Sequence, residues 1–141
     1  MFANPSRDQL QALCRGLRTI AVVGLSPNPA RPSHGVARAL QRLGLRIVPV
    51  RPALNEVLGE PAWPSLSAIP EDLRRQIDVV DVFRNADQVA PLVDECIALG
   101  LPAIWLQDGV IDEVAAQRGR EAGLTVVMDR CLWRDYIAFT S

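Results

Sequence analysis

Short apolar segments alternate with amphipathic segments along the whole chain. Between the apolar segments, hydrophobic residues recur at helical spacing, which predicts helices over residues 33–43, 87–99 and 111–122. The apolar segments themselves are continuous runs bounded by Gly, Pro or charged residues, and such runs are typical of strands buried on both faces of a parallel sheet. The predicted strands are residues 19–24, 45–50, 77–83, 102–106 and 125–128.

Two further helices are predicted at the ends of the chain. Ser6 opens the first, and Gln9 three positions later completes a capping-box pattern. The second lies within residues 130–139. Ser33 is a good N-cap for the helix that follows the first strand. Residues 55–70 carry turn signals and are expected to form a loop.

Five strands separated by helices predict an α/β fold: a Rossmann-like, doubly wound, mainly parallel five-stranded sheet with helices on both faces, in three α/β/α layers. We expect one domain over residues 1–141, with the helix in residues 1–18 packing on it. In such sheets ligands bind beyond the carboxyl ends of the strands. Candidate chemistry is therefore sought in the loops that follow the strands.

Composition removes several kinds of chemistry. The chain has 15 basic residues, all of them Arg, and its one histidine is His34. A chain with no lysine has neither a Schiff-base lysine nor the lysine of a Walker phosphate loop. One histidine does not provide a zinc site of two or three histidines, so no metal site is predicted. The net charge of −1 gives no general attraction to nucleic acid or to an anionic membrane.

The cysteines and the apolar runs indicate the cellular compartment. Cys14, Cys96 and Cys131 are odd in number and far apart, which favours a reducing compartment over a disulfide framework. No apolar run approaches the ~20 residues that cross a bilayer, and the first residues do not resemble a signal peptide. We therefore expect a cytoplasmic protein without a membrane partner.

The loop after the first strand is the most informative segment. Ser26, Arg31 and Ser33 surround a helix N-terminus, where unpaired N–H groups and the helix dipole attract phosphate. Gly24 and Ser26 stand where a dinucleotide fingerprint has its first two glycines, so that fingerprint is broken. The alternative is structural: Ser33 only caps the helix and Arg31 is solvated.

The loop after the second strand bears on the type of nucleotide. NAD-binding folds usually carry an acidic residue there to bind the ribose hydroxyls, and this chain has Arg51. A guanidinium can pair with a phosphorylated ribose, which favours NADP or a 3′-phosphorylated adenosine. An exposed arginine with no ligand is the alternative.

Five segments together resemble the stand-alone CoA-binding domain proteins of bacteria and archaea. The resemblance covers roughly residues 17–136 and extends to the CoA-binding domain of succinyl-CoA synthetase α subunits. The segments are Ala21-Val-Val-Gly-Leu-Ser26, Arg31-Pro-Ser33, Val48-Pro-Val-Arg-Pro52, Val80-Asp-Val-Phe-Arg84 and Val126-Val-Met-Asp-Arg-Cys131.

The resemblance implies a Rossmann-type domain that binds coenzyme A or an acyl-CoA across the strand ends. The phosphates would meet the loop between Ser26 and Ser33, and the adenosine would lie near Arg51. The residues implied to bind the cofactor are Gly24, Leu25, Ser26, Pro27, Asn28, Arg31, Pro32, Ser33, Val50, Arg51, Pro52, Phe83, Arg84, Leu106, Gln107 and Asp108.

Two departures from the family pattern stand out. Arg51 occupies a position where the family usually has Asn, and it is a candidate replacement for a lysine that helps to hold CoA in the synthetases. Asp108 is acidic where the stand-alone family tends to have an apolar residue. A carboxylate beside a polyanion is unfavourable, so Asp108 either points away or lies apart from the phosphates.

No catalytic constellation is identified, and a catalytic role is not assigned. The phosphorylated histidine of the synthetases lies in a domain that this chain lacks, and His34 matches no catalytic position. Cys131 lies on the ligand side of the sheet, where it could meet the CoA thiol, whereas Cys14 and Cys96 are expected in the core. Arg130 beside Asp129 suggests a structural ion pair.

The predicted function is therefore non-catalytic or regulatory binding of CoA or acyl-CoA. The alternative is an NADP-dependent oxidoreductase that uses the same site. A protein partner or a homo-oligomer stays open, as does a scaffold that binds no nucleotide.

Overall fold

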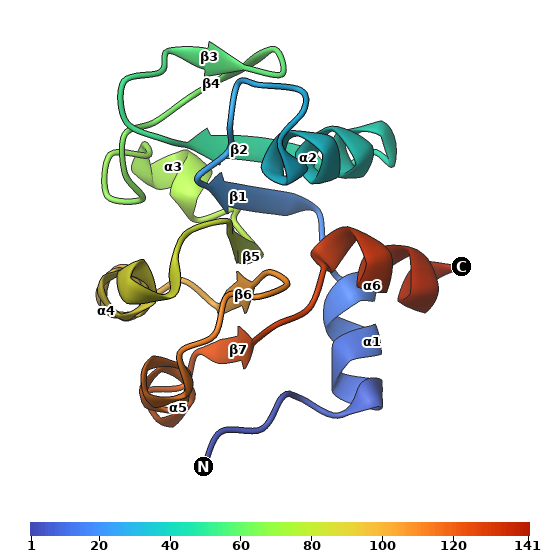
Figure 1. The fold of residues 1–141 in the computed structure, drawn as a ribbon, viewed down its shortest axis with the longest axis vertical. Coiled ribbons are helices and arrows are strands. Elements are labelled where there is room, and N and C mark those ends of the chain that lie inside the picture. Colours follow the sequence, from blue (N-terminus) through green and yellow to red (C-terminus); the bar gives the residue numbers. More distant parts are fainter.

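A computed structural model describes residues 1–141 and shows a central parallel sheet between two layers of helices (Figure 1). The five strands are β1 (Thr19–Val23), β2 (Arg46–Val50), β5 (Val79–Val82), β6 (Ala103–Leu106) and β7 (Thr125–Val127). They are hydrogen-bonded in the order β2-β1-β5-β6-β7, and every neighbouring pair is parallel. The predicted α/β class, strand number and three-layer arrangement are confirmed.

Helices cover the two faces of the sheet unequally. On one face lie α4 (Val89–Leu99) and α5 (Glu113–Glu121), and on the other lie α1 (Arg7–Arg15), α2 (Pro32–Arg42) and α6 (Leu132–Thr140) (Figure 1). The helix α4 follows the 3-10 turn η1 (Ala86–Gln88), so it begins later than predicted. The chain reverses its strand order between β1 and β5, which is the position where doubly wound sheets bind ligands.

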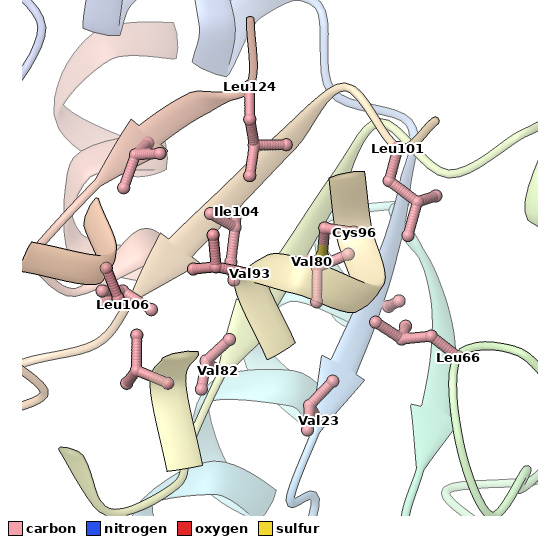
Figure 2. Packing of buried hydrophobic residues seen from close by; sticks show 14 of the residues in the cluster. Val23, Leu66, Val80, Val82, Val93, Cys96, Leu101, Ile104, Leu106 and Leu124 are labelled. Atoms are coloured by element: carbon pink, nitrogen blue, oxygen red, sulfur yellow. The ribbon is translucent and has the colours of Figure 1, made fainter. Parts of the chain in front are cut away.

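Apolar residues from alternate positions of the strands fill both layers. Under α4 and α5 the core includes Val80, Val82 and Ile104, packed against Val93 and Cys96 (Figure 2). Cys96 in α4 and Cys14 in α1 are both fully buried in the core, as predicted, and burial raises the pKa of each thiol to about 12.

The helix α1 packs beside α6, and its predicted capping box is present. The N–H of Gln9 donates to Ser6 Oγ, and the N–H of Ser6 donates to Gln9 Oε1 at 2.8 Å. Asn4 ties the segment before α1 to the end of β7, because its side-chain amide bonds both the N–H and the carbonyl of Met128.

The predicted loop over residues 55–70 contains a small antiparallel hairpin, so this prediction is wrong in part. Its strands, β3 (Glu56–Val57) and β4 (Glu60–Pro61), join at Leu58 and Gly59, which both have positive φ. A short helix, α3 (Glu71–Arg74), follows and was not predicted. No helix of the structure has the length and apolar character needed to span a membrane.

Candidate functional site

A cavity of about 610 Å³ runs along the carboxyl ends of the strands, a volume typical of small-molecule sites. It extends from the loop after β2, past the ends of β1, β5 and β6, to the start of α6. Its lining residues are Gly24, Ser26, Arg31, Pro32, Ser33, Val36, Arg51, Phe83, Arg84, Asn85, Gln107, Asp108, Val110 and Cys131.

Gly24 allows the chain to turn sharply from β1 into this cavity. Its φ is +85°, and a Cβ at this position would collide with the backbone carbonyl of Phe83. The N–H of Gly24 donates to the carbonyl of Val50 at 2.9 Å. The carboxyl ends of β1, β2 and β5 therefore lie close together at Gly24.

The loop after Gly24 is closed by two serine hydroxyls. Ser33 Oγ accepts from the N–H of Ser26 at 3.0 Å, and Ser26 Oγ accepts from the N–H of Asn28 at 3.1 Å. The prediction that Ser33 caps α2 is wrong. The N-cap is Arg31 and Pro32 begins the helix, because proline has the φ that the first helical position requires.

This shift leaves the start of α2 without a side-chain cap. Pro32 has no N–H, and the N–H of Ser33 has no acceptor within the chain. Since Arg31, Pro32 and Ser33 all line the cavity, the positive end of the α2 dipole faces it. This is the geometry that favours an anion at a helix N-terminus.

Three arginines give the cavity its charge. Arg31, Arg51 and Arg84 come from three different loops and line the same space. The salt bridges of the protein are formed by other arginines, so these three guanidinium groups have no acidic partner. Arg51 is fixed by its backbone N–H, which donates to the carbonyl of Trp63 at 2.8 Å.

Asp108 lines the cavity, but its charge is paired. Arg134 Nη2 lies 2.9 Å and 3.2 Å from the two carboxylate oxygens of Asp108, and this carboxylate raises the pKa of Arg134. Arg134 therefore neutralises the one carboxylate that lines the cavity.

Gln107 and Cys131 form the end of the cavity beside α6. Gln107 is only 4% exposed, and its Oε1 accepts from the N–H of Leu132 at 3.0 Å. Its side-chain nitrogen has no acceptor within the chain, although Gln107 lines the cavity. Cys131, at the N-cap position of α6, was predicted on the ligand side and lines the cavity as well.

Six of the sixteen predicted residues lie outside the cavity lining. Three are core side chains, because strand-end residues alternate between the two faces: Leu25, Val50 and Leu106. The other three are exposed on the flanking loops: Pro27, Asn28 and Pro52. Sequence reasoning missed Val36, Asn85 and Val110, which follow predicted residues by one to three positions and could have been found by extending each segment.

The predicted ion pair between Asp129 and Arg130 is wrong. Arg130 pairs with Asp135 in α6, through contacts of 2.5 Å and 3.1 Å, and not with its neighbour Asp129. Asp129 instead accepts from the N–H of Gly109 at 2.7 Å. Asp81, in the middle of β5, is fully buried, and neither of its carboxylate oxygens has a hydrogen-bond partner.

Two buried titratable side chains, Asp81 and His34, are of the types that often act in catalysis, but neither lines the cavity. Burial raises the pKa of Asp81 well above its ordinary value. His34 lies in the first turn of α2, is 7% exposed, and has an Nδ1 without a partner. Neither side chain is among the lining residues.

The fold is that of a doubly wound, Rossmann-like domain, and arginines and an unpaired backbone N–H group lie at the cavity along its strand ends. A model of the family described as CoA binding domain matches residues 18–136. The chain belongs to this CoA-binding domain family, as the resemblance in its loops implied.

Similar proteins agree with this assignment. The chain is 39% identical over 129 residues to Uncharacterized protein YneT of Bacillus subtilis (strain 168), covering 92% of this chain and 93% of that protein. It is similar in structure to cell-free ID.343 from Thermus thermophilus, with a TM-score of 0.86, 34% identity and coverage of 96% and 99% of the two chains.

A more distant relative is a multidomain enzyme. The acetate–CoA ligase [ADP-forming] I of Archaeoglobus fulgidus is 25% identical over 125 residues, which are 82% of this chain but only 18% of the ligase. The chain thus matches one small part of that enzyme. Nothing in the family match supports the alternative of an NADP-dependent oxidoreductase.

Proposed function

We propose that the cavity binds coenzyme A or an acyl-CoA and that the protein acts as a CoA-binding or regulatory protein without catalysis of its own. The observation that carries the proposal is the set of three arginines without acidic partners, Arg31, Arg51 and Arg84, around one cavity. CoA carries a diphosphate and a 3′-phosphate, and it matches such a set in charge.

The order of the groups along the cavity suggests how CoA would lie. Its diphosphate would bind at the start of α2, where the N–H of Ser33 is unpaired and Arg31 is near. Its 3′-phosphate would meet Arg51 after β2, in place of the acidic residue that binds an unphosphorylated ribose. The pantetheine would then cross Phe83 and Arg84 toward Gln107.

A binding role, not a catalytic one, is supported by what surrounds the hydroxyl and thiol groups of the cavity. Ser26 and Ser33 already accept hydrogen bonds from backbone N–H groups of their own loop. The single histidine lies outside the lining, so no serine or cysteine there has an imidazole beside it. The three unpaired thiols fit a reducing cytoplasm.

Titration calorimetry tests the ligand class. We expect the wild-type protein to bind CoA or acetyl-CoA more tightly than NADP, and NAD most weakly, because NAD lacks a ribose phosphate for Arg51. Arg42→Ala is the matched control, since Arg42 is exposed in the last turn of the same helix α2, away from the cavity. Tight binding of NADP with no heat from CoA would overturn the proposal.

A further inference from the structure

The end of the cavity beside α6 holds a thiol where the reactive end of the ligand would lie. Cys131 is the one cysteine that lines the cavity, and the other two are fully buried in the two cores. If Arg51 marks the adenosine end, the sulfur of CoA would lie at the opposite end of the same cavity. That end is formed by Gln107, Asp108, Val110 and Cys131.

A second observation points to a ligand at this end. The N–H of Leu132, the first residue of α6, donates to the side-chain oxygen of Gln107. The side-chain nitrogen of Gln107 has no acceptor in the chain. Gln107 is only 4% exposed, and it lines the cavity. The N–H of Leu132 fixes the orientation of this amide, so its free nitrogen is available at the cavity to donate to a carbonyl of the pantetheine arm.

Cys131 is buried like the other two cysteines, but it lines the cavity and belongs to neither core cluster. Cys131 stands at the N-cap of α6, is 7% exposed, and makes neither a side-chain capping bond nor a disulfide. Desolvation raises the pKa of Cys14 and of Cys96 to about 12, which disfavours the thiolate of both.

We propose that Cys131 forms a mixed disulfide with bound CoA by exchange with CoA disulfide, so that the ligand is held covalently when the CoA pool is oxidised. This inference rests on the proposed CoA site. The Cys131 thiolate attacks one sulfur of CoA disulfide, a bond from Sγ to that sulfur forms, and the original S–S bond breaks. One CoA leaves as thiolate, and the proton of Cys131 passes to solvent. Cys131 is oxidised while the departing half of CoA disulfide is reduced, and an external thiol reverses the step.

The test is mass spectrometry of the whole protein and its peptides after incubation with CoA disulfide. We expect one CoA per chain, mapped to the peptide that contains Cys131 and removed by dithiothreitol. Binding at the cavity should make this labelling at least about tenfold faster than labelling by oxidised glutathione, since it converts exchange between two molecules into exchange within a complex. Acetyl-CoA, which occupies the site without a free thiol, should slow the labelling.

Two variants give the matched comparison. Cys131→Ser should lose the adduct, whereas Cys96→Ser should keep it. Labelling of Cys14 or Cys96, no labelling at all, or equal rates with CoA disulfide and oxidised glutathione would overturn the inference. Calorimetry of CoA with dithiothreitol present separates the two proposals. If CoA binds but CoA disulfide gives no adduct, only the mixed-disulfide inference is wrong. If CoA binds neither the wild-type protein nor Cys131→Ser, the proposed function is wrong.

Discussion

The two faces of the sheet differ sharply in what they bury. Beneath α4 and α5 the core is apolar throughout, from Val80 to Ile104. Beneath α1, α2 and α6, and at the strand ends on that side, lie nearly all of the buried polar residues. Those residues are Ser26, Ser33, His34, Asp81, Gln107 and Asp135. Since Ser33 and Cys131 of this second face also line the cavity, we expect the first face mainly to stabilise the fold and the second to contribute to the proposed binding.

The largest expected effect comes from the apolar face. Ile104 is fully buried among Val80, Val82 and Val93 (Figure 2). Ile104→Ala should destabilise the protein by about 3 kcal/mol in urea unfolding, because it removes buried methyl groups and leaves a cavity. Calorimetry should find the CoA affinity of the folded variant unchanged. A large loss of affinity would show that the two faces are not separable in this way.

On the polar face, the arginines should affect binding and not stability. Arg31→Ala and Arg84→Ala should each weaken CoA binding by about 2 kcal/mol, roughly thirtyfold, because each removes a charge-assisted hydrogen bond. Their unfolding midpoints should match the wild type within a few degrees, since neither side chain has a partner in the protein. A loss as large in Arg42→Ala would mean that overall charge, not the cavity, determines affinity.

Asp81 tests the buried centre of the polar face. Burial raises its pKa in the folded protein, so above its ordinary pKa of 3.8 the unfolded chain ionises while the folded protein keeps the proton. The stability contributed by neutral Asp81 is therefore complete below that pH and falls as pH rises toward the folded pKa, by up to about 1.4 kcal/mol per pH unit.

Asp81→Asn removes this dependence because the amide does not ionise. Urea unfolding of both proteins from pH 4 upward should show the stability of the wild type declining relative to the variant. Parallel profiles would show that Asp81 is ionised in the folded protein and has a partner that the structure lacks.

The smallest expected effect concerns the α6 end of the cavity. Asp108→Asn removes the carboxylate that pairs with Arg134, which leaves one more uncompensated positive charge near the site. CoA should then bind about twofold to fivefold more tightly, an effect that decreases with added salt, because the pair is exposed and its charges are screened. Weaker binding in Asp108→Asn would indicate that Asp108 itself accepts a hydrogen bond from the ligand.

Periodicity predicted the large elements well, because strands such as β1 are buried on both faces and helices such as α2 are amphipathic over three turns. It did not predict the β3–β4 hairpin, since two-residue strands are too short to show a period. The N-cap of α2 was misplaced by two residues, from Arg31 to Ser33, because Ser33 and Pro32 are both favourable near a helix start and only the fold reveals that Ser33 bonds Ser26.

The sequence predicted the charged residues that line the cavity better than the uncharged residues beside them in the same loops. Arg31, Arg51 and Arg84 follow three different strands, and the rule that parallel strands end at one edge places them together. Local sequence does not determine which residues of a loop face outward, so Leu25 and Leu106 were assigned to the site although both are core. Adjacency also suggested the pair of Asp129 with Arg130, whereas helical geometry brings Asp135 to Arg130.

The most direct test compares CoA with dephospho-CoA in the wild type and in Arg51→Ala. If Arg51 binds the 3′-phosphate, calorimetry should show that Arg51→Ala weakens CoA binding by about tenfold or more and changes dephospho-CoA binding little. The wild type should prefer CoA, and the variant should largely lose that preference. Equal losses for the two ligands, or no CoA binding by the wild type, would contradict the account.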